Sequence, residues 1–203
     1  DLATVPFEAE VKVANAHVHK LCWENCTDGC EEKAWLPVAN AEELAKMEPD
    51  GYYFLIDDVT VDEKTLYRGH LCLSSHKLAG TLHAGDGFTL CVCEDNRSNV
   101  PTDKIVVVDG AEVTLYGFMM EAEDAIEVGE NAELNIRTGK NTYNPNMSLA
   151  SIGANSVVNQ YGASLDGTAY EHDGRVPELV IPDTVTVNIY GGRLGYSTLR
   201  TGG

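Results

Sequence analysis

The sequence of 203 residues contains no apolar stretch that approaches the ~20 residues needed to cross a bilayer. It begins at Asp1 without the charged n-region and apolar h-region of a signal peptide, which predicts a mature chain or a fragment of a longer one. Basic residues are scarce, since 14 Lys and Arg accompany 32 Asp and Glu and give a net charge of −18. This charge repels nucleic acid and anionic membrane surfaces, so we expect no nucleic-acid binding and no membrane insertion.

The familiar signatures of catalysis are also missing. We find no Gly-rich phosphate loop, no dinucleotide-binding fingerprint and no Ser-His-Asp arrangement. The arginines are scattered, and the sequence lacks the paired-Asp and Gly-His-Gly patterns of pectin-hydrolysing enzymes. The sequence therefore favours a non-catalytic protein over an enzyme.

What the sequence does contain is an internal repeat from about residue 65 onward. Each unit has a turn followed by two alternating apolar positions, and an apolar strand precedes most of the turns. The turns are marked by Gly87, Gly110, Asn131, Asn155 and Thr184, at spacings of 23, 21, 24 and 29 residues. The longest spacing contains residues 162–177, which we expect to bulge out as a loop.

This period predicts an all-β fold, a right-handed parallel β-helix solenoid, because one short unit cannot bury its apolar face alone and must stack on its neighbours. An antiparallel β-sandwich also has many short strands, but its strands are less alike and less evenly spaced than these units. We expect the β-helix to span residues 51–203 and residues 1–50 to form an N-terminal segment.

The N-terminal segment has three parts. Residues 1–16 alternate as an extended arm, and residues 17–36 are rich in Cys, His and turns. A short capping helix over residues 41–47 follows, with Asn40 as N-cap and Glu43 in a capping box. Such a helix would cover the end of the solenoid and protect its strand edges.

Residues 51–95 resemble a recurrent unit of large secreted surface proteins of anaerobic, often gut-dwelling, bacteria. The likeness rests on an aromatic strand, a Leu71-Cys72-Leu73 strand, a Ser75-His76-Lys77 turn and a Leu90-Cys91-Val92-Cys93 strand. Such units are similar to the pectate-lyase-like right-handed β-helix superfamily. The resemblance implies a β-helix and a secreted or cell-surface location, but it does not choose between lyases, hydrolases and adhesins.

Two groups of cysteines suit an oxidising compartment. The first group combines thiol and imidazole side chains suited to a zinc site or to a structural disulfide, with the disulfide favoured; it comprises His17, His19, Cys22, Cys26 and Cys30. The second group, Cys72, Cys91 and Cys93, lies on predicted strands and is expected to stack as thiols between neighbouring turns of the chain, within reach of a disulfide.

Two further sets of residues are candidates for ligand binding. Glu121, Asp124 and Glu127 belong to an acidic run that could bind calcium, although a solvated acidic corner is the favoured interpretation. Tyr116, Tyr161 and Tyr190 recur at similar places in three units. They could stack on the sugar rings of a glycan, although a structural aromatic stack is favoured.

Three functional hypotheses follow from these observations. The favoured one is a non-catalytic structural or adhesion module, secreted or at the cell surface, that binds a glycan or a host protein ligand. The second is a polysaccharide lyase or glycoside hydrolase that uses the acids near residues 121–130 or the segment 162–177. The third is a self-assembling surface or filament subunit that associates through its terminal strands.

Overall fold

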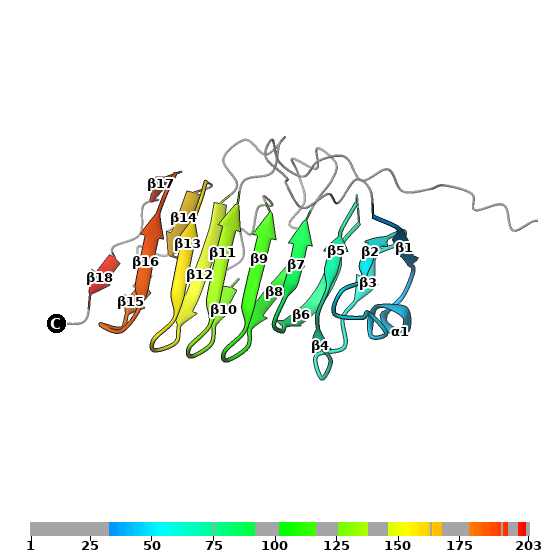
Figure 1. Cartoon of the computed structure of the whole chain (residues 1–203), viewed down its shortest axis with the longest axis horizontal. Coiled ribbons are helices and arrows are strands. Elements are labelled where there is room, and N and C mark those ends of the chain that lie inside the picture. The colour runs from blue at the N-terminus through cyan, green and yellow to red at the C-terminus, as the bar shows by residue number, and fades with distance from the viewer. Residues whose placement is uncertain are drawn as a thin grey trace, which may run out of the picture.

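The computed structural model describes residues 33–74, 76–91, 102–116, 126–137, 146–162, 164–167, 179–191, 193–194 and 199–201. Figure 1 shows short strands stacked along the long axis, from β1 at one end to β16 near the other. All strand pairs in the described residues are parallel. The fold is therefore the predicted parallel β-solenoid, and the antiparallel sandwich is excluded.

The strands form two long sheets and one short sheet. Sheet A has eight strands, and in spatial order they are β1 (Trp35–Val38), β2 (Tyr52–Leu55), β5 (His70–Cys72), β7 (Phe88–Cys91), β9 (Glu112–Tyr116), β11 (Glu133–Arg137), β13 (Val157–Gln160) and β16 (Thr186–Ile189). Sheet B comprises β17 (Arg193–Leu194), β14 (Ser164–Gly167), β12 (Asn146–Ile152), β10 (Ile126–Val128), β8 (Thr102–Val107), β6 (Leu78–Ala84) and β3 (Val59–Thr60), with β4 (Leu66–Tyr67) also paired to β6. Sheet C comprises β15 (Leu179–Ile181) and β18 (Leu199–Thr201).

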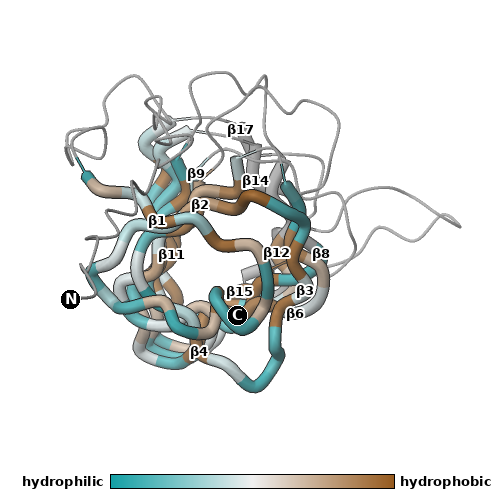
Figure 2. Tube along the Cα trace, turned by 90° about the vertical axis from the view of Figure 1, so that its right-hand side faces the viewer, coloured by the Kyte–Doolittle hydropathy of each residue, from teal (hydrophilic) through white to brown (hydrophobic). Residues whose placement is uncertain are grey.

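Alternating side chains of sheet A fill the interior, as the period of two in the sequence predicts. One register position defines what we call the interior row: Leu36, Tyr53, Leu71, Leu90, Leu115, Ile136, Gln160 and Ile189. The six inner members of this row are at most 8% exposed. Successive turns of the chain overlie one another in Figure 2, so each apolar side chain is covered by its counterparts above and below.

The corners that lead into sheet A share one backbone conformation. Gly87, Gly110, Asn131 and Asn155 have φ values of 75°, 71°, 55° and 59°, in the left-handed region that Gly and Asn tolerate best. These are four of the five turn markers that the repeat predicts. At the fifth marker, Thr184, a side chain connects the corner to the one before it. The Thr184 hydroxyl accepts a hydrogen bond of 3.0 Å from the Asn155 N–H.

Consecutive corners also touch one another directly. A Cβ added to Gly153 would lie 2.5 Å from the Glu130 nitrogen, and one added to Gly129 would lie 2.7 Å from the Asp109 nitrogen. The Asp109 carboxylate accepts a hydrogen bond of 2.8 Å from the Glu130 N–H in the next turn. Glycine is therefore required where one corner rests on the backbone of another.

Helix α1 spans Ala41–Leu44 and is shorter than predicted. The Asn40 side chain accepts a hydrogen bond from the Glu43 N–H, as predicted for the N-cap, and the Glu43 carboxylate reaches back to accept one from the Ala39 N–H, one residue before the position that a capping box uses. The backbone then tightens, with a hydrogen bond from the Met47 N–H to the Leu44 carbonyl. Pro49 disfavours a helical conformation at Glu48, so the helix cannot extend past this turn.

Two segments that were expected to lie outside the regular coils each contribute a strand to the sheets. Residues 162–177 were expected to bulge out, but β14 lies within this segment and joins sheet B between β12 and β17. Strand β1, which falls in the predicted N-terminal segment 1–50, is the first strand of sheet A. The extended arm and most of the Cys/His-rich segment lie outside the described residues, and the capping role of the helix stays a prediction.

Candidate binding face of sheet A

The outward side of sheet A carries aligned rows of side chains, because parallel strands in register place equivalent residues side by side. One register position defines what we call the aromatic row: Pro37, Phe54, Cys72, Cys91, Tyr116, Arg137, Tyr161 and Tyr190. Its two halves differ in exposure. Four members at the β2 to β9 end are buried and form an apolar cluster with Trp35: Phe54, Cys72, Cys91 and Tyr116.

The three predicted tyrosines do lie in one row, but they do not form one stack. Arg137, the register partner of Tyr116, separates Tyr116 from the other two. Tyr116 is only 5% exposed, whereas Tyr161 is 38% and Tyr190 is 65% exposed. The predicted tyrosine ladder is therefore reduced to two solvent-accessible rings.

The rings of Tyr161 and Tyr190 stack on each other, and the guanidinium group of Arg137 contacts the Tyr161 ring. The ring centroids of Tyr161 and Tyr190 lie 4.8 Å apart at an interplanar angle of 11°. The guanidinium carbon of Arg137 lies 4.2 Å from the centroid of Tyr161, which is a cation–π contact on the opposite face of that ring. One face of Tyr161 is thus turned toward Arg137 and the other toward Tyr190. Tyr190 keeps its second face for solvent or a ligand, as far as the described residues show.

A second outward row, which we call the asparagine row, consists of Asn135, Asn159 and Asn188. The Asn188 amide donates to the Asn159 Oδ1 at 2.9 Å, and the Asn159 amide donates to the Asn135 Oδ1 at 3.0 Å. In each of these hydrogen bonds the amide on the later strand donates to the amide oxygen on the earlier strand. The Asn188 Oδ1 therefore accepts no hydrogen bond from another member of the row. This row was not predicted, although an Asn recurs directly after an apolar residue in ELNIR, VVNQ and TVNI.

The described cysteines of the second group are neighbours. Cys72 and Cys91 are register partners on adjacent strands, and both side chains are buried. They point away from the interior, since the flanking Leu71 and Leu90 occupy the interior row. Cys93 lies outside the described residues.

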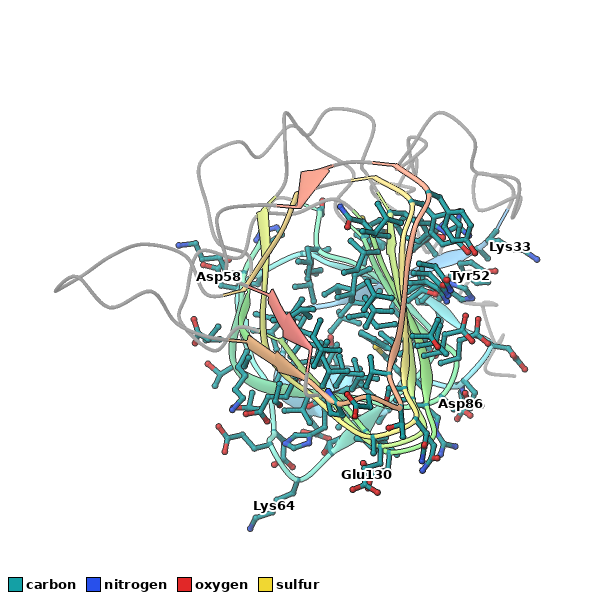
Figure 3. The ribbon with its side chains drawn as sticks, turned by 90° about the vertical axis from the view of Figure 1, so that its left-hand side faces the viewer. Lys33, Tyr52, Asp58, Lys64, Asp86 and Glu130 are labelled. Atoms are coloured by element: carbon teal, nitrogen blue, oxygen red, sulfur yellow. The ribbon has the colours of Figure 1, made fainter. Side chains whose placement is uncertain are left out.

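A third set of ring contacts lies near β1. Tyr52 stacks on His70 with centroids 4.2 Å apart, and Trp35 meets Tyr52 edge-on at 5.3 Å. The ammonium group of Lys33 lies 5.5 Å from the centroid of Tyr52. Figure 3 shows the Lys33 and Tyr52 side chains on the outside of the solenoid.

The predicted metal sites fall mostly outside the described residues. This is so for His17, His19, Cys22, Cys26, Cys30, Glu121 and Asp124. The Glu127 carboxylate, which is described, accepts a hydrogen bond of 2.7 Å from the Lys104 ammonium group on β8. Within the described ranges, no group of three or more His, Cys, Asp or Glu side chains is placed to hold a metal ion.

The shifted pKa values belong to structural contacts. The pKa of Glu42 is lowered by its hydrogen bond to Lys46 on the exposed surface of α1. The pKa of Tyr67 is raised chiefly because the ring is buried. Both groups lie away from the two outward rows, so neither supplies acid–base chemistry to this face.

Together the fold and the outward rows define a parallel β-solenoid with two exposed tyrosine rings and the half-buried Asn188 at one end of sheet A. No protein-family model matches this chain, and no curated protein or solved structure matches it. The described part of the chain also holds no helix with the length and apolar character needed to span a bilayer.

Proposed function

We propose that this chain is a non-catalytic structural and adhesion module of a secreted or cell-surface protein, and that it binds a neutral glycan at β13 and β16. The observation that carries the proposal is the exposed pair of Tyr161 and Tyr190, held by Arg137 on a rigid sheet. Aromatic rings that are fixed in place stack on the apolar faces of sugars with little loss of conformational entropy.

The neighbouring side chains suit sugar hydroxyl groups. Asn188 and Thr186 point to the same side of β16 as Tyr190, because residues two apart share a face of a strand. The Asn188 Oδ1 can accept a hydrogen bond from a hydroxyl group at the end of the asparagine row. The net charge of −18 disfavours a polyanionic glycan, which is why we propose a neutral one.

The wider setting that we propose follows the resemblance of residues 51–95 to secreted surface proteins of anaerobic bacteria and to the pectate-lyase-like superfamily. The parallel solenoid supports this setting only at the level of architecture. A polysaccharide lyase or hydrolase remains the alternative, and a direct assay separates the two.

The test combines binding with turnover. Glycan-array screening of the whole chain should identify neutral oligosaccharides, and Tyr190→Ala should weaken the best of them about tenfold, the loss of roughly 1.4 kcal/mol of contact energy. Leu66→Ala is a matched control, since Leu66 is 43% exposed on β4. Equal binding by both variants would exclude the aromatic pair as the site. Release of reducing ends or unsaturated products from polysaccharides would contradict a non-catalytic role.

A further inference from the structure

The interior row is closed along its length and open at its two ends. Its first member, Leu36 on β1, is 53% exposed, and its last member, Ile189 on β16, is 49% exposed. Between them Leu71, Leu90, Leu115, Ile136 and Gln160 are fully buried. The ends are open because each lies on a terminal strand of sheet A, with a covering strand on one side only in the described part of the chain.

The backbone of β16 is arranged to accept another parallel strand. The N–H groups of Thr186 and Tyr190 donate to β13, at 3.0 Å to the Ser156 carbonyl and 2.8 Å to the Gln160 carbonyl. Backbone groups alternate in direction along a strand, so those of Val187 and Ile189 point to the opposite edge. This edge is a template for a strand of the same direction.

We propose that copies of this chain associate end to end, with β1 of one copy beside β16 of the next. The register of sheet A then places Leu36 on Ile189, which continues the interior row across the contact. Pro37 of the second copy takes the position next to Tyr190 in the aromatic row. The contact joins two different surfaces of the chain, so it is heterologous and open-ended.

Two features make this association weak and dependent on salt. Pro37 has no N–H and points its backbone away from β2, since the Val38 carbonyl accepts from the Ile56 N–H on the β2 side. One hydrogen bond of the new ladder is therefore missing. The net charge of −18 also makes copies repel, and this repulsion is screened at about 0.3 M salt.

The experiment is sedimentation velocity on the full chain, from micromolar to hundreds of micromolar, at low and high salt. The wild-type chain should form dimers and larger species in a series that grows with concentration and salt. Leu36→Asp and Ile189→Asp should each be monomeric alone. An equimolar mixture of the two variants should form a dimer and nothing larger, because each variant retains one intact end.

Leu66→Asp places the same charge on a side chain that is 43% exposed on β4, and it should associate like the wild type. Circular dichroism of each variant verifies the fold. A wild-type chain that is monomeric under all conditions overturns the proposal. So does a Leu36→Asp variant that still dimerises alone, since this would indicate a symmetric contact between two β16 strands.

The proposals of end-to-end association and of glycan binding are tested independently. Glycan binding is measured at concentrations where the chain is monomeric, so that Tyr190 is uncovered. Loss of association leaves glycan binding intact, and absence of any glycan ligand leaves the sedimentation result unchanged.

Discussion

At the scale of single residues, the left-handed corner position decides which side chains each turn of the chain accepts. A Cβ at Gly110 would meet no atom within 4 Å, so the restriction there comes from the backbone and not from space. Asn131 and Asn155 occupy equivalent corners with φ values of 55° and 59°. The same position therefore admits two residue types for one conformational reason.

We expect Gly110→Asn to change the free energy of unfolding by less than about 0.5 kcal/mol, because Asn tolerates the left-handed region. Gly110→Val should cost about 2 kcal/mol, since a β-branched residue is an outlier at positive φ. Urea unfolding monitored by circular dichroism measures both. Equal stability of the two variants would show that the corner does not constrain φ.

Tyr67 is a second residue with a measurable consequence. Its ring is buried, and its hydroxyl accepts a hydrogen bond of 2.9 Å from the Asp62 N–H. Burial raises the pKa of Tyr67 above the usual 10.0, so the folded state favours the neutral phenol. The resulting stabilisation is complete below pH 10 and is lost as the pH rises through the higher folded-state value.

We therefore expect Tyr67→Phe to lose about 1 kcal/mol at pH 7 through its hydrogen bonds. From pH 9 to pH 11 the variant should lose less stability than the wild type. Urea midpoints at these pH values give the comparison, with Tyr190→Phe as the matched control because Tyr190 is 65% exposed. Parallel alkaline losses in the wild type and Tyr67→Phe would contradict the assignment.

At the scale of elements, the asparagine row links three strands of sheet A by side chains as well as by backbone. Asn159 is the central member and is 5% exposed, and its amide also donates to the Glu133 carboxylate at 2.8 Å. Removing it leaves the Asn188 amide without its acceptor and the Asn135 Oδ1 without its donor. We therefore expect loss of the central Asn159 to destabilise the fold more than loss of the terminal Asn188.

We expect Asn159→Ala to lower the free energy of unfolding by about 2 kcal/mol, because buried polar partners lose their hydrogen bonds. Asn188→Ala should cost less, about 1 kcal/mol, since it breaks one hydrogen bond at the end of the row. Thermal and urea unfolding of both variants test the order. A larger loss for Asn188→Ala would show that the row does not act through its centre.

At the scale of the whole molecule, the sequence was sufficient for the architecture. The alternation of apolar residues and the Gly or Asn corners act locally, so they predicted the parallel solenoid and the positions of four turns that prove to have positive φ. The rows of the binding face depend on register, which is non-local. Register shifts between Leu78 and Thr81 and between Ile126 and Glu127 cannot be derived from spacing alone. Arg137 lies in sheet A, where β9 and β11 pair without such a shift, so the aligned units EVTLY and ELNIR already placed Arg137 beside Tyr116, although this neighbour was not predicted.

The contact of Gly153 with the corner before it has a consequence for how this architecture can change in evolution. A methyl group added to Gly153 would lie 2.5 Å from backbone atoms of Gly129 and Glu130, so it fits only if the two neighbouring coils move apart. Insertions and deletions should therefore accumulate away from the glycine corners, between β9 and β10 and between β11 and β12. Homologous chains should have corners of constant length at these glycines. Their length should vary in the segments between a strand of sheet A and the next strand of sheet B.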